Sequence, residues 1–284
     1  MNASTQNNLK TFVLLAGLTA VLLLIGYKIG SMGGLFIAGI FVLIMNFGSY
    51  WFSDKLALAM NHARPVSQQD APQLYSTVQY LAQRAGLPMP RIYMTPDMQP
   101  NAFATGRNPQ HAAVAVTQGI MQMLSQAELE GVLAHELAHI KHRDILISTV
   151  TATLAGVLSY IPYILLFFGD DDSPLGFVGT MAMWIIAPMA AAMIQMAVSR
   201  SREYEADREG ARICGQPLAL ANALRRLENG AQTIPMQVSQ ATAHMYITNP
   251  LRGDGLNKLF SSHPPTAERV ARLEAMANNP GLMN

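Results

Sequence analysis

Four long apolar runs interrupt the polar parts of the chain, over residues 11–29, 34–52, 145–168 and 177–198. Each is about as long as the roughly 17–25 residues that a helix needs to cross a bilayer. They form two pairs, and the short acidic stretch 169–174 joins the members of the second pair. No small-residue cleavage site follows the first run, so it does not read as a signal peptide. The pattern therefore predicts two transmembrane hairpins.

Lysine and arginine near the ends of membrane spans mark the cytoplasmic side. On one side of the four runs lie Lys10, Lys55, Arg64, Lys141, Arg143, Arg200, Arg202 and Arg208. The other side has Lys28 alone. We therefore expect both termini and both polar regions, 53–144 and 199–284, to be cytoplasmic.

The two polar regions show helical and strand patterns. Asp70 and Pro72 open a helix that Gly86 ends, and short strands follow over 91–94, 102–104 and 112–116, divided by Pro, Asn and Gly. In the second region, helices are predicted over 217–229, before Gly230, and over 266–277. Residues 231–260 show no clear period, which predicts a mobile loop or lid.

The composition supports a membrane protein. Of the 284 residues, 50% are hydrophobic and 13% are charged, and the mean hydropathy is +0.20, whereas soluble proteins carry roughly 25% charged residues. The net charge of +1 offers no basic excess for a phosphate backbone, so we expect no nucleic-acid partner. A single cysteine, Cys214, excludes disulfides and cysteine-based zinc sites. Chemistry must rest on histidine and carboxylates, or on hydroxyls.

The stretch 135–139, His-Glu-Leu-Ala-His, carries the strongest chemical signal. Ser125 and Glu128 have the spacing of a capping box, so a helix should begin there. Four residues advance a helix by about 6 Å and 400°, which places His135 and His139 on one face, within reach of one metal ion. Glu136 lies beside that face, where it can hold a metal-bound water molecule without itself binding the metal. A surface helix with two solvated histidines fits this apolar, alanine-rich stretch less well.

A catalytic zinc takes three protein ligands and keeps one open position. His142 overshoots, because it lies about 10.5 Å along the helix axis from His135. Glu203 and Asp207 are one helical turn apart on a shared face, and Glu205 points away. Glu203 can therefore bind the metal while Asp207 accepts a hydrogen bond from a ligand imidazole. A salt-bridged helix surface remains the alternative for this stretch.

These motifs together resemble the membrane-bound zinc metalloproteases of the HtpX type, which are related to the C-a-a-X prenyl proteases. The resemblance rests on residues 135–139 running into an apolar span, 203–207, 262–265 with 268–269, and 101–103. With the four apolar runs, it covers nearly the whole chain. It implies a mainly α integral membrane protein with four transmembrane helices and a cytoplasmic zincin-like α+β catalytic domain that contains a small sheet. Residues 1–52 and 145–198 would form the hairpins, and 53–144 and 199–284 the two parts of the catalytic domain.

The resemblance also implies an activity and a site. Glu203 would be the third ligand of one Zn²⁺ per chain, His263 and Arg269 would approach the active site, and Asn101 would begin an edge strand that pairs with extended substrate. Members of this family cleave misfolded or surplus membrane proteins at the cytoplasmic face of the bacterial inner membrane. The expected partners are thus unfolded or membrane-protein substrates and the lipid bilayer.

The expected reaction is peptide hydrolysis, in which zinc polarises the scissile carbonyl and acidifies water while Glu136 accepts and returns a proton. His263 is the candidate donor to the oxyanion, with a structural role before the Pro264-Pro265 turn as its alternative. Arg269 is alternatively only a partner for Glu268 or for another carboxylate of the chain.

Two other functions are compatible with parts of the sequence. A site-2-type intramembrane protease is suggested by Asn249-Pro250 and Asp254-Gly255, but such enzymes place the metal-binding helix in a span, and here it precedes one. The second is a metal transporter or membrane chaperone without hydrolytic activity, but transporters usually place ionisable residues inside their spans. All seven histidines lie outside the apolar runs.

Overall fold

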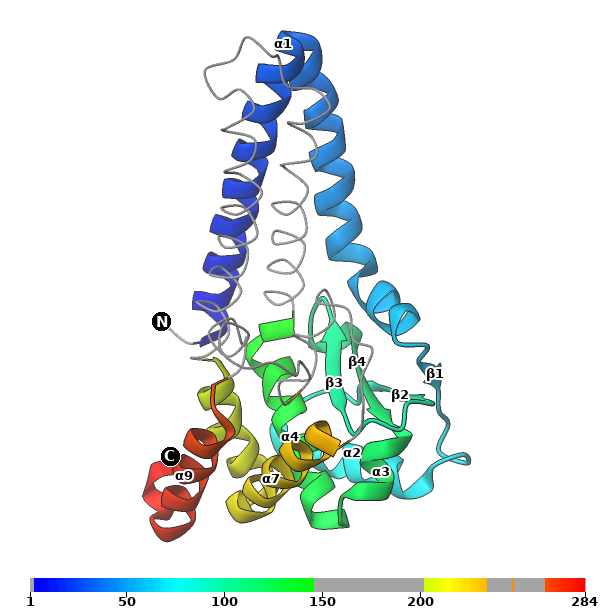
Figure 1. Cartoon of the computed structure of the whole chain (residues 1–284), viewed down its shortest axis with the longest axis vertical. Coiled ribbons are helices and arrows are strands. Elements are labelled where there is room, and N and C mark those ends of the chain that lie inside the picture. Colours follow the sequence, from blue (N-terminus) through cyan, green and yellow to red (C-terminus); the bar gives the residue numbers. More distant parts are fainter. Residues whose placement is uncertain (1–2, 146–201, 234–246, 248–263, 284) are drawn as a thin grey trace.

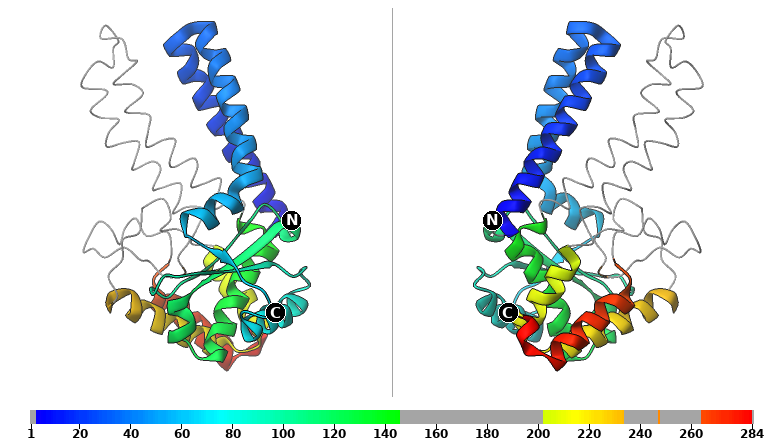
Figure 2. Two further views of the ribbon diagram at one scale, coloured as in Figure 1. Left: turned by 90° about the vertical axis from the view of Figure 1, so that its right-hand side faces the viewer. Right: turned by 90° about the vertical axis from the view of Figure 1, so that its left-hand side faces the viewer.

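The computed structural model describes residues 3–145, 202–233, 247 and 264–283 of the chain. A long helical hairpin rises from a body made of a small sheet and several helices, and the three views agree on this arrangement (Figures 1 and 2). The sheet and helix α4 position the residues singled out above.

The hairpin is α1 (Ala3–Met60), in which two helices meet at Gly30 and Ser31, where the backbone leaves helical geometry. A Cβ atom on Gly34 would lie 2.0 Å from the carbonyl oxygen of Gly26, so only glycine permits the two backbones to come this close. The structure thus has helices where the first two spans are predicted. Among the described helices, none combines the length and apolarity that crossing a bilayer requires. Apart from Ile145, the predicted third and fourth spans lie outside the described residues.

Four strands form the sheet, in the order β1-β2-β4-β3, with β2 and β4 parallel and the other pairs antiparallel. Their bounds are Arg64–Pro65, Arg91–Thr95, Ala102–Gly106 and Ala112–Thr117 for β1 to β4. Strands β2, β3 and β4 confirm the three sequence predictions. The two-residue β1 was not predicted, because it is too short to show a period. Within the described part of the chain, β3 is an edge strand.

The helices of the body carry the core. They are α2 (Pro72–Ala85), α3 (Gln118–Met123), α4 (Gln126–His142), a helical stretch over 202–214, α7 (Pro217–Thr233) and α9 (Thr266–Asn278), with 3₁₀ turns at Pro109–His111 and Pro280–Met283. Helix α2 ends at Gly86, whose φ of 69° is left-handed, as the sequence predicts.

Strand β4 is buried on both faces. Val114 and Val116 belong to the main core together with residues of α2, α4 and α7. Ala113 and Ala115 pack on the opposite face in a smaller cluster that contains Leu58 of α1. The sheet is therefore enclosed by the helical body on one side and by the end of the hairpin on the other.

The predicted end of the helix before Gly230 is wrong. Helix α7 continues through this glycine to Thr233, so the predicted loop begins later than residue 231. A Cβ atom on Gly230 would lie 2.7 Å from Met123 Cε and 3.1 Å from Pro100 Cγ. The glycine is therefore a point of close helix packing, not a terminator. Within 234–260 only Ile247 is described.

Candidate metal centre

Helix α4 begins with the predicted capping box. Ser125 Oγ accepts a hydrogen bond from the Glu128 amide, and Glu128 Oε2 accepts one from the Ser125 amide at 2.8 Å. Leu133 and Leu137 are fully buried in the core behind the helix. The helix is therefore fixed at its start and along its apolar face, and its histidines keep a defined orientation.

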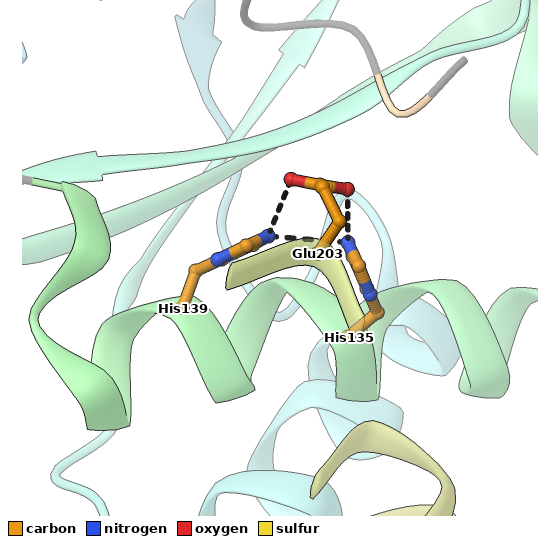
Figure 3. Close-up of side chains that lie close together, drawn as sticks. All are labelled: His135, His139 and Glu203. Atoms are coloured by element: carbon orange, nitrogen blue, oxygen red, sulfur yellow. Dashed lines mark hydrogen bonds and ion pairs between the residues drawn. The ribbon is translucent and has the colours of Figure 1, made fainter. Parts of the chain in front are cut away.

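Three side chains meet as the sequence predicts. The Nε2 atoms of His135 and His139 are 3.2 Å apart. Oxygens of Glu203 lie 3.6 Å from His135 Nε2 and 3.5 Å from His139 Nε2. Figure 3 shows both imidazoles rising from α4 toward the carboxylate, which comes from the helical stretch 202–214. One donor atom from each residue lies within 4.8 Å of the other two.

Two carboxylates lie against the other nitrogens of these imidazoles. Asp207 Oδ1 is 3.0 Å from His135 Nδ1, the partnership predicted from the helical spacing of Asp207. Asp144 Oδ2 is 3.0 Å from His139 Nδ1. The sequence reasoning missed Asp144, which lies beyond the end of α4. A proton on each Nδ1 leaves both Nε2 lone pairs pointing into the cluster.

Arg269 is almost completely buried, with 1% of its surface exposed. Its Nε and Nη2 atoms donate to the two oxygens of Asp207 at 2.8 and 2.7 Å, and its Nη1 lies 3.4 Å from Glu203 Oε2. Burial alone would raise the pKa of Asp207, but the charge and hydrogen bonds of Arg269 lower it to about 2. Arg269 is thus the partner of Asp207, while Glu268 pairs with Arg272.

Glu136 lies beside the cluster and not within it. Its Oε2 accepts a hydrogen bond from the backbone amide of Ala104 in β3, at 2.8 Å. Burial raises the pKa of Glu136 to about 7, against the opposing charge of His139. A carboxyl group with this pKa can both take and release a proton near neutral pH.

The pKa values of the two histidines are shifted in opposite directions. Burial lowers the pKa of His135 and outweighs the hydrogen bond with Asp207. For His139, burial acts in the same direction, but Asp144 and Glu203 raise its pKa to about 9. The carboxylates around His139 therefore favour a positive charge at this point.

The remaining predicted residues are placed as follows. Asn101 lies directly before β3 and is buried, and its side-chain oxygen accepts a hydrogen bond from the Ile247 amide at 3.2 Å. Glu205 pairs with Arg208, and its side chain is 42% exposed, which agrees with its predicted orientation away from the site. His263 lies outside the described residues.

The donor set fits a zinc ion. Two neutral imidazole nitrogens and one carboxylate are the ligands of a catalytic zinc site with an open position. His135 and Glu203 are buried, and His139 is partly buried. Asp207 and Asp144 favour a positive charge at the cluster and orient the two imidazoles through their Nδ1 atoms.

Comparison with known sequences identifies the family. The model of peptidase family M48 matches residues 68–277. The chain belongs to peptidase family M48. This chain is therefore a zinc metallopeptidase, and the peptidase is favoured over the transporter, the chaperone and the site-2-type protease.

Relatives of this M48 peptidase extend over nearly its whole length. A protease HtpX homolog from Ralstonia pickettii is 56% identical over 95% of this chain and 97% of the relative. A second, from Pelotomaculum thermopropionicum, is 54% identical over 96% of this chain and 100% of the relative. Among solved structures, the crystal structure of S. mikatae Ste24p matches with a TM-score of 0.55 and 20% identity, over 96% of this chain and 66% of Ste24p. That likeness supports the fold.

Proposed function

We propose that this M48 peptidase is an endoprotease that cleaves misfolded or surplus membrane proteins at the cytoplasmic face of the bacterial inner membrane. The observation that carries the proposal is the meeting of His135, His139 and Glu203 beside Glu136 and the edge strand β3. Ligands, a general base and a strand edge for substrate are the parts that a metalloendopeptidase needs.

His135, His139 and Glu203 would hold the zinc ion. When bound there, zinc supplies Lewis-acid chemistry, which polarises the scissile carbonyl and acidifies water. Asp207 keeps the proton of His135 on Nδ1, and Arg269 fixes the Asp207 carboxylate with two hydrogen bonds. The protein thus orients His135 through the nitrogen that would not bind the metal.

Glu136 would act as the general base. It takes a proton from the attacking water and passes it to the leaving amine. The Ala104 amide fixes its carboxylate next to β3, where an extended substrate can add to the sheet. Asn101 would set the start of this edge, since it directly precedes Ala102 and is held by two hydrogen bonds. Its amide donates to Thr117 Oγ1, and its side-chain oxygen accepts from the Ile247 amide.

His263 would donate a hydrogen bond to the oxyanion. If it does, His263→Ala should lower kcat by roughly 10² to 10³ without loss of zinc or of thermal stability. A variant that unfolds at lower temperature but keeps its kcat would instead show that His263 braces the Pro264-Pro265 turn.

The membrane location is supported by the four apolar runs, the low charge content and the one-sided distribution of lysine and arginine. The relatives at 54–56% identity are named protease HtpX homologs. Membrane proteins would be the substrates because the catalytic residues precede and follow the second predicted hairpin directly, at the same membrane face.

Removal and return of zinc test the enzymatic proposal. The protein is purified under chelation, and its zinc content and its cleavage of an unfolded protein are measured before and after zinc is added. We expect one zinc per chain and cleavage only in the loaded form. Equal cleavage by the metal-free protein would contradict the proposal.

A further inference from the structure

Two residues that flank the second predicted hairpin lie next to proposed ligands, since Asp144 contacts His139 and Arg202 directly precedes Glu203. We propose that Asp144 and Arg202 are positioning residues, which hold His139 and Glu203 in ligating geometry. The inference rests on the proposed zinc site and adds to it two residues that do not bind the metal.

Asp144 reaches His139 because α4 ends with a sharp turn. Arg143 adopts a left-handed conformation, with φ of 60° and ψ of 30°, and its amide bonds back to the carbonyls of His139 and Ile140. At this turn the regular helix ends, and the Asp144 carboxylate lies 3.0 Å from His139 Nδ1, five residues back along the chain. Asp144 is 2% exposed, so water does not compete strongly for this contact.

The contact decides which nitrogen of His139 is available. A carboxylate at Nδ1 accepts its proton in a hydrogen bond, which leaves the Nε2 lone pair free. Nε2 then points toward His135 Nε2 and Glu203 Oε1, at 3.2 and 3.5 Å. His139 is 16% exposed and His135 only 1%, so core packing restrains the His139 ring less. Its orientation therefore depends more on Asp144.

Arg202 joins the same turn to the third ligand. Its Nη1 donates a hydrogen bond to the Asp144 carbonyl oxygen at 3.3 Å, across 58 residues of sequence. Arg202 directly precedes Glu203, so this bond ties the start of the 202–214 helix to the end of α4. One residue, Asp144, thus orients His139 through its side chain and is linked to Glu203 through its backbone.

The hydrogen bond between Arg202 and Asp144 also connects the two ends of a long segment of the sequence. Residues 145–198, the predicted second hairpin, lie between Asp144 and Arg202. The bond therefore joins the chain just before this hairpin to the chain just after it, directly beside two of the proposed ligands.

The test measures zinc affinity of the full-length, detergent-solubilised protein by competition with a chelator. For Asp144→Ala we expect zinc to bind about 10- to 100-fold more weakly. Asp144→Asn should fall between this variant and the wild type, because the amide oxygen can still accept from Nδ1. Arg202→Gln should weaken zinc binding less than Asp144→Ala. The visible absorption of the Co²⁺-loaded protein should also change in Asp144→Ala, since it reports the geometry of the ligands and not overall stability.

Glu209→Gln is the matched control. Glu209 also bridges the 202–214 helix and α4, through Lys141 at 2.8 Å, but it contacts none of the proposed ligands. Its zinc affinity should equal that of the wild type. Equal weakening in Glu209→Gln and both Asp144 variants would mean that the helix contact alone matters, and the proposal would fall.

Glu203→Ala separates failure of this inference from failure of the metal site. If Glu203→Ala loses zinc while Asp144→Ala and Asp144→Asn keep wild-type affinity and Co²⁺ absorption, the positioning role is wrong and the site stands. If all these variants keep zinc, the site itself is wrong, and the inference falls with it.

Discussion

Two buried glutamates of the candidate metal centre have the same chemical group and different proposed roles. Glu136 accepts a hydrogen bond from the Ala104 amide, which holds it beside the strand edge. Glu203 lies between two imidazoles, with Arg269 behind it. The proposed roles, proton transfer for Glu136 and metal binding for Glu203, therefore follow from the neighbours of each glutamate, because the carboxyl groups themselves are the same.

Glu136→Gln separates these tasks. The amide oxygen of glutamine can still accept from Ala104, so the fold and the ligand set should persist while the base is lost. We expect proteolysis to fall by about 10² to 10⁴ with zinc still near one per chain. Activity and zinc content are measured on the same sample, and a joint loss would show that Glu136 serves the metal site itself.

Glu203 and Glu205 form an internal comparison on one helix. Glu203→Ala should abolish tight zinc binding because it removes a proposed ligand. Glu205→Ala removes an exposed pair with Arg208 and should change the free energy of unfolding by about 0.5 kcal/mol or less. Zinc content after dialysis checks both, and equal retention would rule out Glu203 as a ligand.

Reasoning from the residues alone predicts members of the centre where helical spacing reports them, whereas Arg269 was predicted only from the family resemblance. His135 with His139 and Glu203 with Asp207 are each four residues apart, so each pair shares a helix face. Asp144 was missed because it reaches His139 through a left-handed turn at Arg143, which no helical period describes. Contacts between distant segments, such as that of Asn101 with Ile247, leave no local pattern either.

Two glycines set how closely the helices approach α4. A Cβ atom on Gly210 would lie 2.9 Å from both the Cα and the amide nitrogen of His135. A Cβ atom on Gly131 would lie 2.9 Å from the Cα and the nitrogen of Leu220 in α7. The first contact places the helix that carries Glu203 against the turn of α4 that carries His135, and the second involves none of the proposed ligands.

Gly210→Ala and Gly131→Ala should therefore differ in one respect. Alanine usually stabilises a helix interior by up to about 1 kcal/mol relative to glycine, but here the clash should reverse the sign, by roughly 1 to 3 kcal/mol. Both variants should melt at lower temperature, and only Gly210→Ala should also bind zinc more weakly. Stabilisation by either change would show that the helices can separate without cost.

Secondary structure was predictable where amphipathic periods are long. Helices α2 and α9 and the capped start of α4 follow from apolar spacing and end signals. Gly230 misled the prediction, because its role is to admit Met123 from α3 and not to end α7. The conformation at position 230 is therefore determined by tertiary packing and not by the local sequence.

On the scale of the whole molecule, the α1 hairpin is joined to the sheet at several points. Asp54 forms an ion pair with Arg91 of β2, and Arg107 lies 4.4 Å above the ring of Trp51. Leu58 packs against Phe103 of the edge strand. The hairpin and the strand proposed to bind substrate therefore form one connected unit (Figure 2).

Single cysteines in a Cys214→Ser background test the proposed orientation. A thiol at position 173, outside the described residues, should react with a membrane-impermeant reagent from the periplasm. Thiols at positions 125 and 261 should not react, because the positive-side count places them in the cytoplasm. Labelling of all three from outside would put the metal centre on the other face.

The hydrogen bond from Ala104 to Glu136 leaves a gap in any ladder built on β3. An extended chain that adds to this edge meets backbone donors and acceptors at alternate residues, but the Ala104 amide is already committed. Whichever direction the added chain runs, one of its carbonyl groups lacks the donor that a complete sheet would supply. If substrate adds to β3 as proposed, that carbonyl oxygen would lie beside Glu136 without a backbone donor, and it would be the one available for polarisation by the zinc ion.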